Sequence, residues 1–108
     1  MPAEYQIILN TCPDQDQAIH LANVLIDKNL AACVNIVPGL TSIYKWEGQT
    51  RTGTEVLLII KTRSDCYAEI ESTIRSQHPY ELPEIISVPI QNGLKNYLDW
   101  IDNATGKL

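Results

Sequence analysis

Residues 78–84 gather side chains of this 108-residue chain that could do chemistry. The segment reads His-Pro-Tyr-Glu-Leu-Pro-Glu, so it carries an imidazole, a phenol and two carboxylates. Its two prolines exclude helix before each of them, and the segment leads directly into the apolar stretch 85–90. Loops outside strand ends often carry binding groups. The segment is therefore either a functional loop or an ordered approach to a sheet.

His78 is the candidate metal ligand of this segment. Its imidazole could bind a divalent cation weakly, together with a carboxylate such as Glu81. The alternative is a loop imidazole that is hydrogen-bonded to the backbone. His20, the second histidine, lies beside the apolar stripe of a predicted helix and is expected at the surface.

A second group of residues could hold a small anionic ligand. Lys61 ends an apolar strand, where a cation needs a partner. Glu55 lies on the same face of that strand, because side chains alternate with a period of two. Tyr80, Glu81 and Trp46 could converge with Lys61 near a subunit boundary. The alternative is an intersubunit network of ion pairs and hydrogen bonds.

The cysteines give little indication of catalysis or of a structural metal. Cys12, Cys33 and Cys66 are far apart and show neither a CxxC motif nor zinc-ligand spacing, so we expect mostly buried thiols in a reducing compartment. No glycine-rich phosphate loop, GxSxG or HExxH motif is present. Cys33 with His78 as its base is conceivable, but a thiol in an apolar strand is usually inert. The chain is therefore predicted not to be an enzyme.

Length and charge restrict the remaining classes. A chain of this size forms one domain, residues 1–108. Its net charge of −5 and isoelectric point near 4.8 disfavour binding to nucleic acid or anionic membranes. The N-terminus lacks the basic and apolar regions of a signal peptide, and no apolar run reaches the roughly 20 residues of a membrane span. A cytoplasmic protein is expected.

Four strands are predicted from apolar runs, at residues 5–9, 32–46, 52–62 and 85–90. Pro38-Gly39 interrupts the second strand and favours a bulge or bend there. A turn at 47–49 joins the second strand to the third, which predicts one unusually long β-hairpin.

Three helices are predicted from apolar residues at helical spacing. The first covers residues 15–28, with Asp14 as its N-cap. Ser64 or Asp65 is expected to cap the second, and Pro79 bounds it. The last helix follows Asn92-Gly93, and its predicted apolar face consists of Leu94, Tyr97, Leu98 and Ile101.

The order βαββαβ, followed by a helix, predicts an α+β ferredoxin-like sandwich with an extended hairpin between its second and third strands and an extra C-terminal helix. Helices cover only one sheet face in such a fold, so strands should alternate apolar and polar residues. The run 56–60 is apolar on both faces instead. Another copy of the chain is the simplest cover for the second face, and Ile43, Tyr44 and Trp46 on the hairpin would pack against that copy.

Five motifs together resemble the CutA family of divalent-cation tolerance proteins. They are Leu-Ala-Ala-Cys-Val-Asn-Ile at 30–36, Ser-Ile-Tyr-Lys-Trp-Glu-Gly at 42–48, Lys-Thr at 61–62, His-Pro-Tyr-Glu-x-Pro-Glu at 78–84 and Tyr-Leu-x-Trp at 97–100. The resemblance covers nearly the whole chain. It implies a ferredoxin-like protomer in a homotrimer, with sheets around a threefold axis and hairpins reaching between subunits. It also implies a role in tolerance of copper and other divalent metals.

The resemblance also suggests where copper would bind. The ligands proposed for some bacterial relatives correspond here to Asn10, Gln77 and His78, and only His78 keeps a ligand type. Cys12 lies two residues beyond Asn10. Weak binding of Cu²⁺ or another divalent cation is therefore expected. Two alternatives are a PII-like trimeric sensor that binds a small anionic ligand at the subunit cleft, and a structural trimer without ligand.

Overall fold

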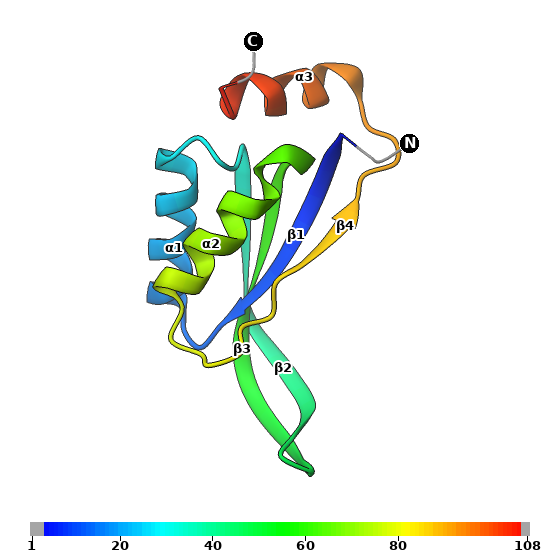
Figure 1. Cartoon of the computed structure of the whole chain (residues 1–108). Helices are drawn as coiled ribbons and strands as arrows, with labels where there is room; N and C mark the ends of the chain where they lie inside the picture. Colours follow the sequence, from blue (N-terminus) through cyan, green and yellow to red (C-terminus); the bar gives the residue numbers. More distant parts are fainter. Residues whose placement is uncertain (1–3, 107–108) are drawn as a thin grey trace.

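The computed structural model describes residues 4–106, whose strands form one antiparallel sheet in the order β2-β3-β1-β4. The elements are β1 (Tyr5–Cys12), α1 (Gln15–Asp27), β2 (Cys33–Trp46), β3 (Gln49–Arg63), the short 3₁₀ helix η1 (Ser64–Cys66), α2 (Tyr67–Gln77), β4 (Ile86–Pro89) and α3 (Lys95–Ala104). Figure 1 shows α1 and α2 packed on one face of the sheet. The α+β class and the order of elements agree with the sequence prediction.

The hairpin of β2 and β3 is the longest feature of the molecule, and its outer half extends beyond the other two strands (Figure 1). The pairing register shifts between Val37 and Leu40, so the bulge predicted at Pro38-Gly39 is confirmed. Glu47 and Gly48 form the two-residue turn, with φ angles of +52° and +76°. Two consecutive positive φ angles are typical of a type I′ turn, whose twist matches that of paired strands.

The helix starts agree only in part with the prediction. Asp14 caps α1 as expected, because its Oδ1 accepts the backbone N–H of Gln17 at 2.9 Å. The prediction that Ser64 or Asp65 caps α2 is wrong, since both residues lie in η1 and α2 begins at Tyr67. The Asp65 carboxylate is engaged elsewhere: both of its oxygens accept hydrogen bonds from Arg63 Nη1 at 2.6 Å.

The core lies between the sheet and the helices α1 and α2. Alternate residues of β1 and β3 point toward these helices and are fully buried, and the helices contribute apolar side chains from their facing sides. The fully buried core residues include Ile8, Leu25, Leu58, Ile60, Ile70 and Ile74.

The opposite sheet face is apolar but incompletely covered; we call it the open face. It carries Leu57 and Ile59 of β3 with Leu9 of β1, all only partly exposed. On β4, Ile86 and Val88 pair with β1 on this face and are 51% and 45% exposed. The expectation that β3 is apolar on both faces is therefore confirmed, and one chain leaves the second face accessible.

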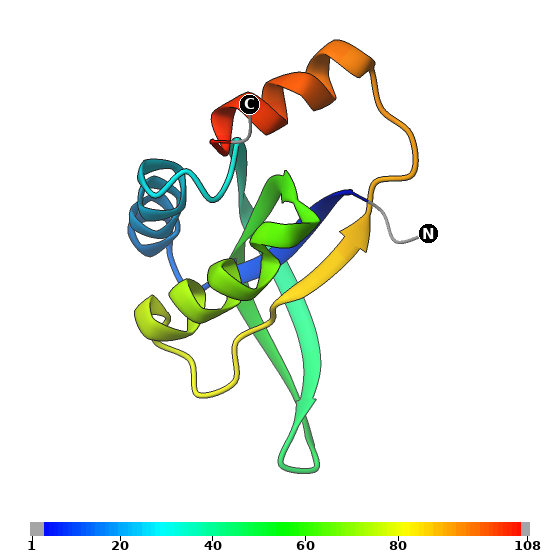
Figure 2. The same cartoon turned by 45° about the horizontal axis from the view of Figure 1, so that its top comes forward.

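Helix α3 lies across one end of the sheet in both views (Figures 1 and 2). Ile101 is buried there, but Leu94 precedes the helix and is 75% exposed. Of the predicted apolar face, Leu98 is partly buried within one chain, whereas Tyr97 is 40% exposed. Polar contacts also fix α3: the Tyr5 hydroxyl donates to Asp102 at 2.8 Å, and Arg63 Nε donates to Thr105 at 2.7 Å. None of the helices within residues 4–106 has the length and apolarity that crossing a membrane requires.

Candidate functional site

The 78–84 loop, which links α2 to β4, is fastened to β1 and β3 by hydrogen bonds. His78 Nε2 lies 2.7 Å from the carbonyl oxygen of Thr11, and the Tyr80 backbone N–H donates to His78 Nδ1 at 3.2 Å. The Tyr80 hydroxyl donates to Glu55 at 2.8 Å. At the far end of the loop, Asn10 Nδ2 donates to the carbonyl oxygen of Glu84, also at 2.8 Å. The loop is therefore held near its start, at Tyr80 and at its end.

These contacts fix the protonation pattern of His78. A carbonyl oxygen can only accept, so Nε2 must carry the proton that bonds Thr11. The Tyr80 amide can only donate, so Nδ1 must offer its lone pair. In this arrangement the ring hydrogen is on Nε2, and both ring nitrogens are occupied by hydrogen bonds. This is the backbone-bonded loop imidazole that was the alternative to a metal ligand.

Cys12 is the nearest group with ligand chemistry. Its Sγ lies 3.8 Å from His78 Nε2 and 3.5 Å from Asn10 Oδ1, so Asn10 and Cys12 face the same side of β1. The thiol is only 2% exposed. Burial raises the pKa of Cys12 to about 11, and the nearby carboxylates of Asp14 and Glu55 add to this. The thiol is protonated at neutral pH, which argues against a nucleophilic role.

Glu55 forms a compact polar cluster beneath the loop. Burial acts to raise the pKa of Glu55, but hydrogen bonds from the hydroxyls of Ser42, Tyr80 and Thr11 outweigh it and hold that pKa below its usual value. The hydrogen bond between Tyr80 and Glu55 has the opposite effect on the tyrosine. Burial raises the pKa of Tyr80, and the bond to Glu55 raises it further. The carboxylate is thus ionised and already satisfied within one chain.

A cavity of about 200 Å³ adjoins Cys12 and His78 on the side of α1. It is also lined by Asp16, His20 and Gln77. His20 is exposed, as predicted, and its Nε2 lies 3.3 Å from the Gln77 side-chain oxygen. Among residues 4–106, no three His, Cys, Asp or Glu side chains are grouped closely enough to hold a metal ion.

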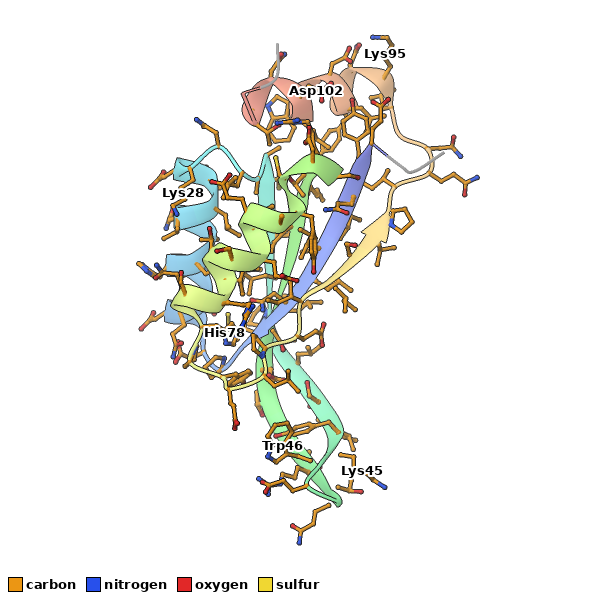
Figure 3. All side chains as sticks on the ribbon, viewed as in Figure 1. Lys28, Lys45, Trp46, His78, Lys95 and Asp102 are labelled. Carbon is orange, nitrogen blue, oxygen red and sulfur yellow. The ribbon has the colours of Figure 1, made fainter. Side chains whose placement is uncertain are left out.

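The five residues of the predicted anion cleft do not meet within one chain. Tyr80 contacts Glu55, whereas Lys61 is six residues farther along β3, about 20 Å at the usual rise per residue. Trp46 pairs with Gln49 beside the hairpin turn, and Figure 3 shows it well away from His78. Glu81 is exposed and has no hydrogen bond or ion pair to any other residue that the structure describes.

Lys61 lies at the opposite end of the open face, near α3. It is partly buried and opposite Cys33 in the pairing register. Its Nζ lies 5.9 Å from the centre of the Tyr97 ring, and the Trp100 ring lies 5.4 Å from that of Tyr97. Within residues 4–106 it forms no ion pair with a carboxylate. Among the described residues, the partner of this cation is therefore the face of the Tyr97 ring.

Sequence reasoning missed Thr11 and Ser42 as members of the site, and it placed Cys12 only as the residue two positions beyond Asn10. The first strand was predicted to end at Leu9, yet β1 continues to Cys12. The pairing of Thr11 and Cys12 with β3 places both beside the loop. Pro13-Asp14 is the predicted break after this strand, and the strand in fact runs up to Pro13.

Comparison with known proteins places these features in one family. Residues 6–104 match the family described as CutA1 divalent ion tolerance protein. The divalent-cation tolerance protein CutA of Thermus thermophilus is 43% identical over 94% of this chain and 98% of its own length. The chloroplastic protein CutA of Arabidopsis thaliana is 41% identical over 92% of this chain, which spans only 54% of that longer relative. A solved structure of CutA1 from the psychrotrophic bacterium Shewanella sp. SIB1, described as a stable protein, is 38% identical; the match covers 99% of this chain and 100% of that one, with a TM-score of 0.95.

Proposed function

Because this chain belongs to the CutA1 divalent ion tolerance family, we propose that it is a ferredoxin-like homotrimer that binds Cu²⁺ or another divalent cation weakly. In this proposal the protein contributes to the response to metal ions without catalysing a reaction. The related proteins are named for tolerance of divalent cations, which supports this general role.

The observation that carries the proposal is the 3.8 Å approach of Cys12 Sγ to His78 Nε2. Metal–sulfur and metal–nitrogen bonds of about 2.3 and 2.0 Å separate two tetrahedral donors by roughly 3.5 Å, so the thiol and the imidazole fit one ion. Sulfur and imidazole are also the donors that copper prefers among protein side chains. The adjoining cavity gives the pair a route of access.

The same geometry explains why binding should be weak. Among residues 4–106, no third His, Cys, Asp or Glu side chain joins the pair, and His78 Nε2 already bonds the Thr11 carbonyl. Cys12, with a pKa near 11, must lose its proton to bind, so affinity should rise with pH across the neutral range. A bound cation would act here as a ligand of Cys12 and His78 and not as a reaction centre.

The homotrimer is supported by the open face. Its exposed Ile86 and Val88, next to the partly exposed Leu9 and Ile59, form an apolar surface that a soluble monomer rarely leaves uncovered. Strands β2 and β4 are both sheet edges, so each presents unpaired backbone groups to a neighbour. On the hairpin, Ile43 is 71% exposed and would gain packing from a second copy.

Calorimetric titration of the full chain with Cu²⁺, and with Zn²⁺ as a redox-inert ion, tests the cation site. We expect dissociation constants in the micromolar range or weaker, and loss of binding in both His78→Ala and Cys12→Ser. Cys66→Ser is the matched control, since Cys66 is a second buried thiol away from the loop. Binding that persists in His78→Ala would contradict the site, and an absence of binding in the natural chain would contradict the function.

A second candidate function is supported by Lys61, a partly buried ammonium without a carboxylate partner among the described residues. A PII-like sensor would use this cation to hold a small anionic ligand at a subunit cleft. Lys61→Met should then abolish binding of the anion and leave the cation titration unchanged. A purely structural trimer would bind neither. We also propose a cytoplasmic location, supported by three unpaired cysteines, although two plant relatives are named as chloroplastic.

A further inference from the structure

We infer that His78 has two mutually exclusive roles: it either fastens the 78–84 loop or binds a cation. This inference rests on the cation site proposed above. Cation binding is then coupled to release of the Tyr80 backbone amide from the imidazole. Binding of a cation at this weak site would therefore change the conformation of the 78–84 loop, which leads into β4.

The argument follows from the polarity of the hydrogen bonds around the imidazole. A neutral imidazole has one lone pair and one N–H, and here both are used, by the Tyr80 amide and by the Thr11 carbonyl. If Nε2 binds the cation, its proton leaves the Thr11 carbonyl and the ring must carry its hydrogen on Nδ1, facing the Tyr80 N–H. If Nδ1 binds the cation, the Tyr80 N–H is displaced directly. Either route breaks the bond from the Tyr80 amide.

The released amide belongs to a residue that also holds the loop through its side chain. The Tyr80 hydroxyl donates to Glu55 at 2.8 Å, and the Tyr80 ring lies 4.7 Å from the His78 ring. Moving the amide away from His78 therefore strains the phenol–carboxylate bond. The far end of the loop stays fixed by Asn10, so movement is confined to the segment between His78 and Glu84.

This coupling predicts that loosening the loop strengthens cation binding. Tyr80→Phe removes the hydroxyl that bonds Glu55 and leaves both proposed ligands untouched. Binding then no longer has to work against that hydrogen bond, so we expect affinity for Zn²⁺ to rise roughly two- to tenfold. Tyr67→Phe is the matched control: Tyr67 also donates to a carboxylate, Glu71, at 2.9 Å, but within α2.

The direct test is NMR of the ¹⁵N-labelled full chain during titration with Zn²⁺. Without metal, the His78 ring should show a proton on Nε2 and an accepting Nδ1, and the Tyr80 amide should be protected from exchange. At saturation, the Tyr80 amide should lose its hydrogen-bonded shift and exchange at least about tenfold faster. The Ile90 amide, which donates to the Tyr5 carbonyl at 3.0 Å, should be unaffected.

The outcomes separate the coupling from the function on which it rests. Absence of Zn²⁺ and Cu²⁺ binding would overturn both. Binding that depends on His78 but leaves the Tyr80 amide unchanged would overturn the coupling alone. A ring protonated on Nδ1 in the metal-free chain, or equal affinities for Tyr80→Phe and Tyr67→Phe, would also overturn the coupling. Faster exchange at Tyr80 with tighter binding only in Tyr80→Phe would support it.

Discussion

Replacing Ile59 with glutamate should dissociate the proposed trimer into monomers. Ile59 lies on β3 in register with Leu9 of β1 and Asn35 of β2, and therefore near the middle of the open face. In a single chain this side chain is only partly covered, so a carboxylate there can still reach water. In the proposed trimer the same position is enclosed by a second copy.

The size of the effect follows from this difference in environment. Assembly covers only the part of Ile59 that one chain leaves exposed, so the apolar burial lost is a fraction of the about 1.5–3 kcal/mol of a whole isoleucine. Enclosing a carboxylate without a partner adds a penalty of at least about 2 kcal/mol. Three subunits together therefore lose on the order of 6–10 kcal/mol, which is about half or more of the free energy of a nanomolar association. Little trimer should remain at micromolar protein.

Size-exclusion chromatography with light scattering measures this outcome directly. The natural chain should have three times the 12.1 kDa protomer mass, and Ile59→Glu should have the protomer mass alone. Thermal unfolding of the natural chain should rise in midpoint with protein concentration, and that of the variant should not. Ser72→Glu, on the exposed side of α2, adds the same charge away from the open face and should stay trimeric. A trimeric, equally stable Ile59→Glu protein would refute the packing argument.

Three further predictions concern single side chains. Glu47 has φ +52° beside Gly48 in the hairpin turn, so Glu47→Asn should raise the free energy of unfolding by about 0.5–1 kcal/mol in a urea titration. Glu55 has a depressed pKa in the folded chain, so its contribution to stability is present above the unfolded value near 4.5 and is lost as pH falls through the lower folded value. The midpoint difference between the natural chain and Glu55→Gln should therefore shrink between pH 5 and pH 3. Because the pKa of Cys12 is raised from 9.0 to about 11, its alkylation by iodoacetamide at pH 8, followed by mass spectrometry, should be about a hundredfold slower in the folded chain than in urea; equal rates would contradict its burial.

Local patterns were sufficient to predict the elements of this fold. The apolar run at residues 56–60, the Pro38-Gly39 bulge and the Asp14 cap each depend on neighbours a few positions away, and the structure contains all three. The cap of α2 was predicted wrongly because the Asp65 carboxylate bonds Arg63 instead of the helix N-terminus. Residue preferences for capping positions take no account of such a competing partner.

The site could be predicted only in outline. The composition of the 78–84 loop identified His78 and Tyr80 as polar groups near a strand, but not their partners. Those partners, Thr11 and Glu55, are 67 and 25 residues away in sequence. Residue content also could not distinguish a ligand from a loop imidazole, because the distinction depends on which groups face the two ring nitrogens.

The predicted anion cleft requires the trimer, whereas the proposed cation site of Cys12 and His78 does not. Lys61 lies near the C-terminal end of β3 and Glu55 near its middle on the same face, about 20 Å apart, so one chain cannot bring them together. A threefold ring joins unlike surfaces of neighbouring copies, and only such a contact could place Lys61 of one copy near Tyr80 or Trp46 of the next. Cys12 and His78, by contrast, meet within one chain. Monomeric Ile59→Glu should therefore lose any anion binding that requires Lys61 while keeping its affinity for Zn²⁺. If monomeric Ile59→Glu instead binds the anion but not Zn²⁺, both assignments are wrong. The anion site would then lie within one chain, and the cation site would require two chains.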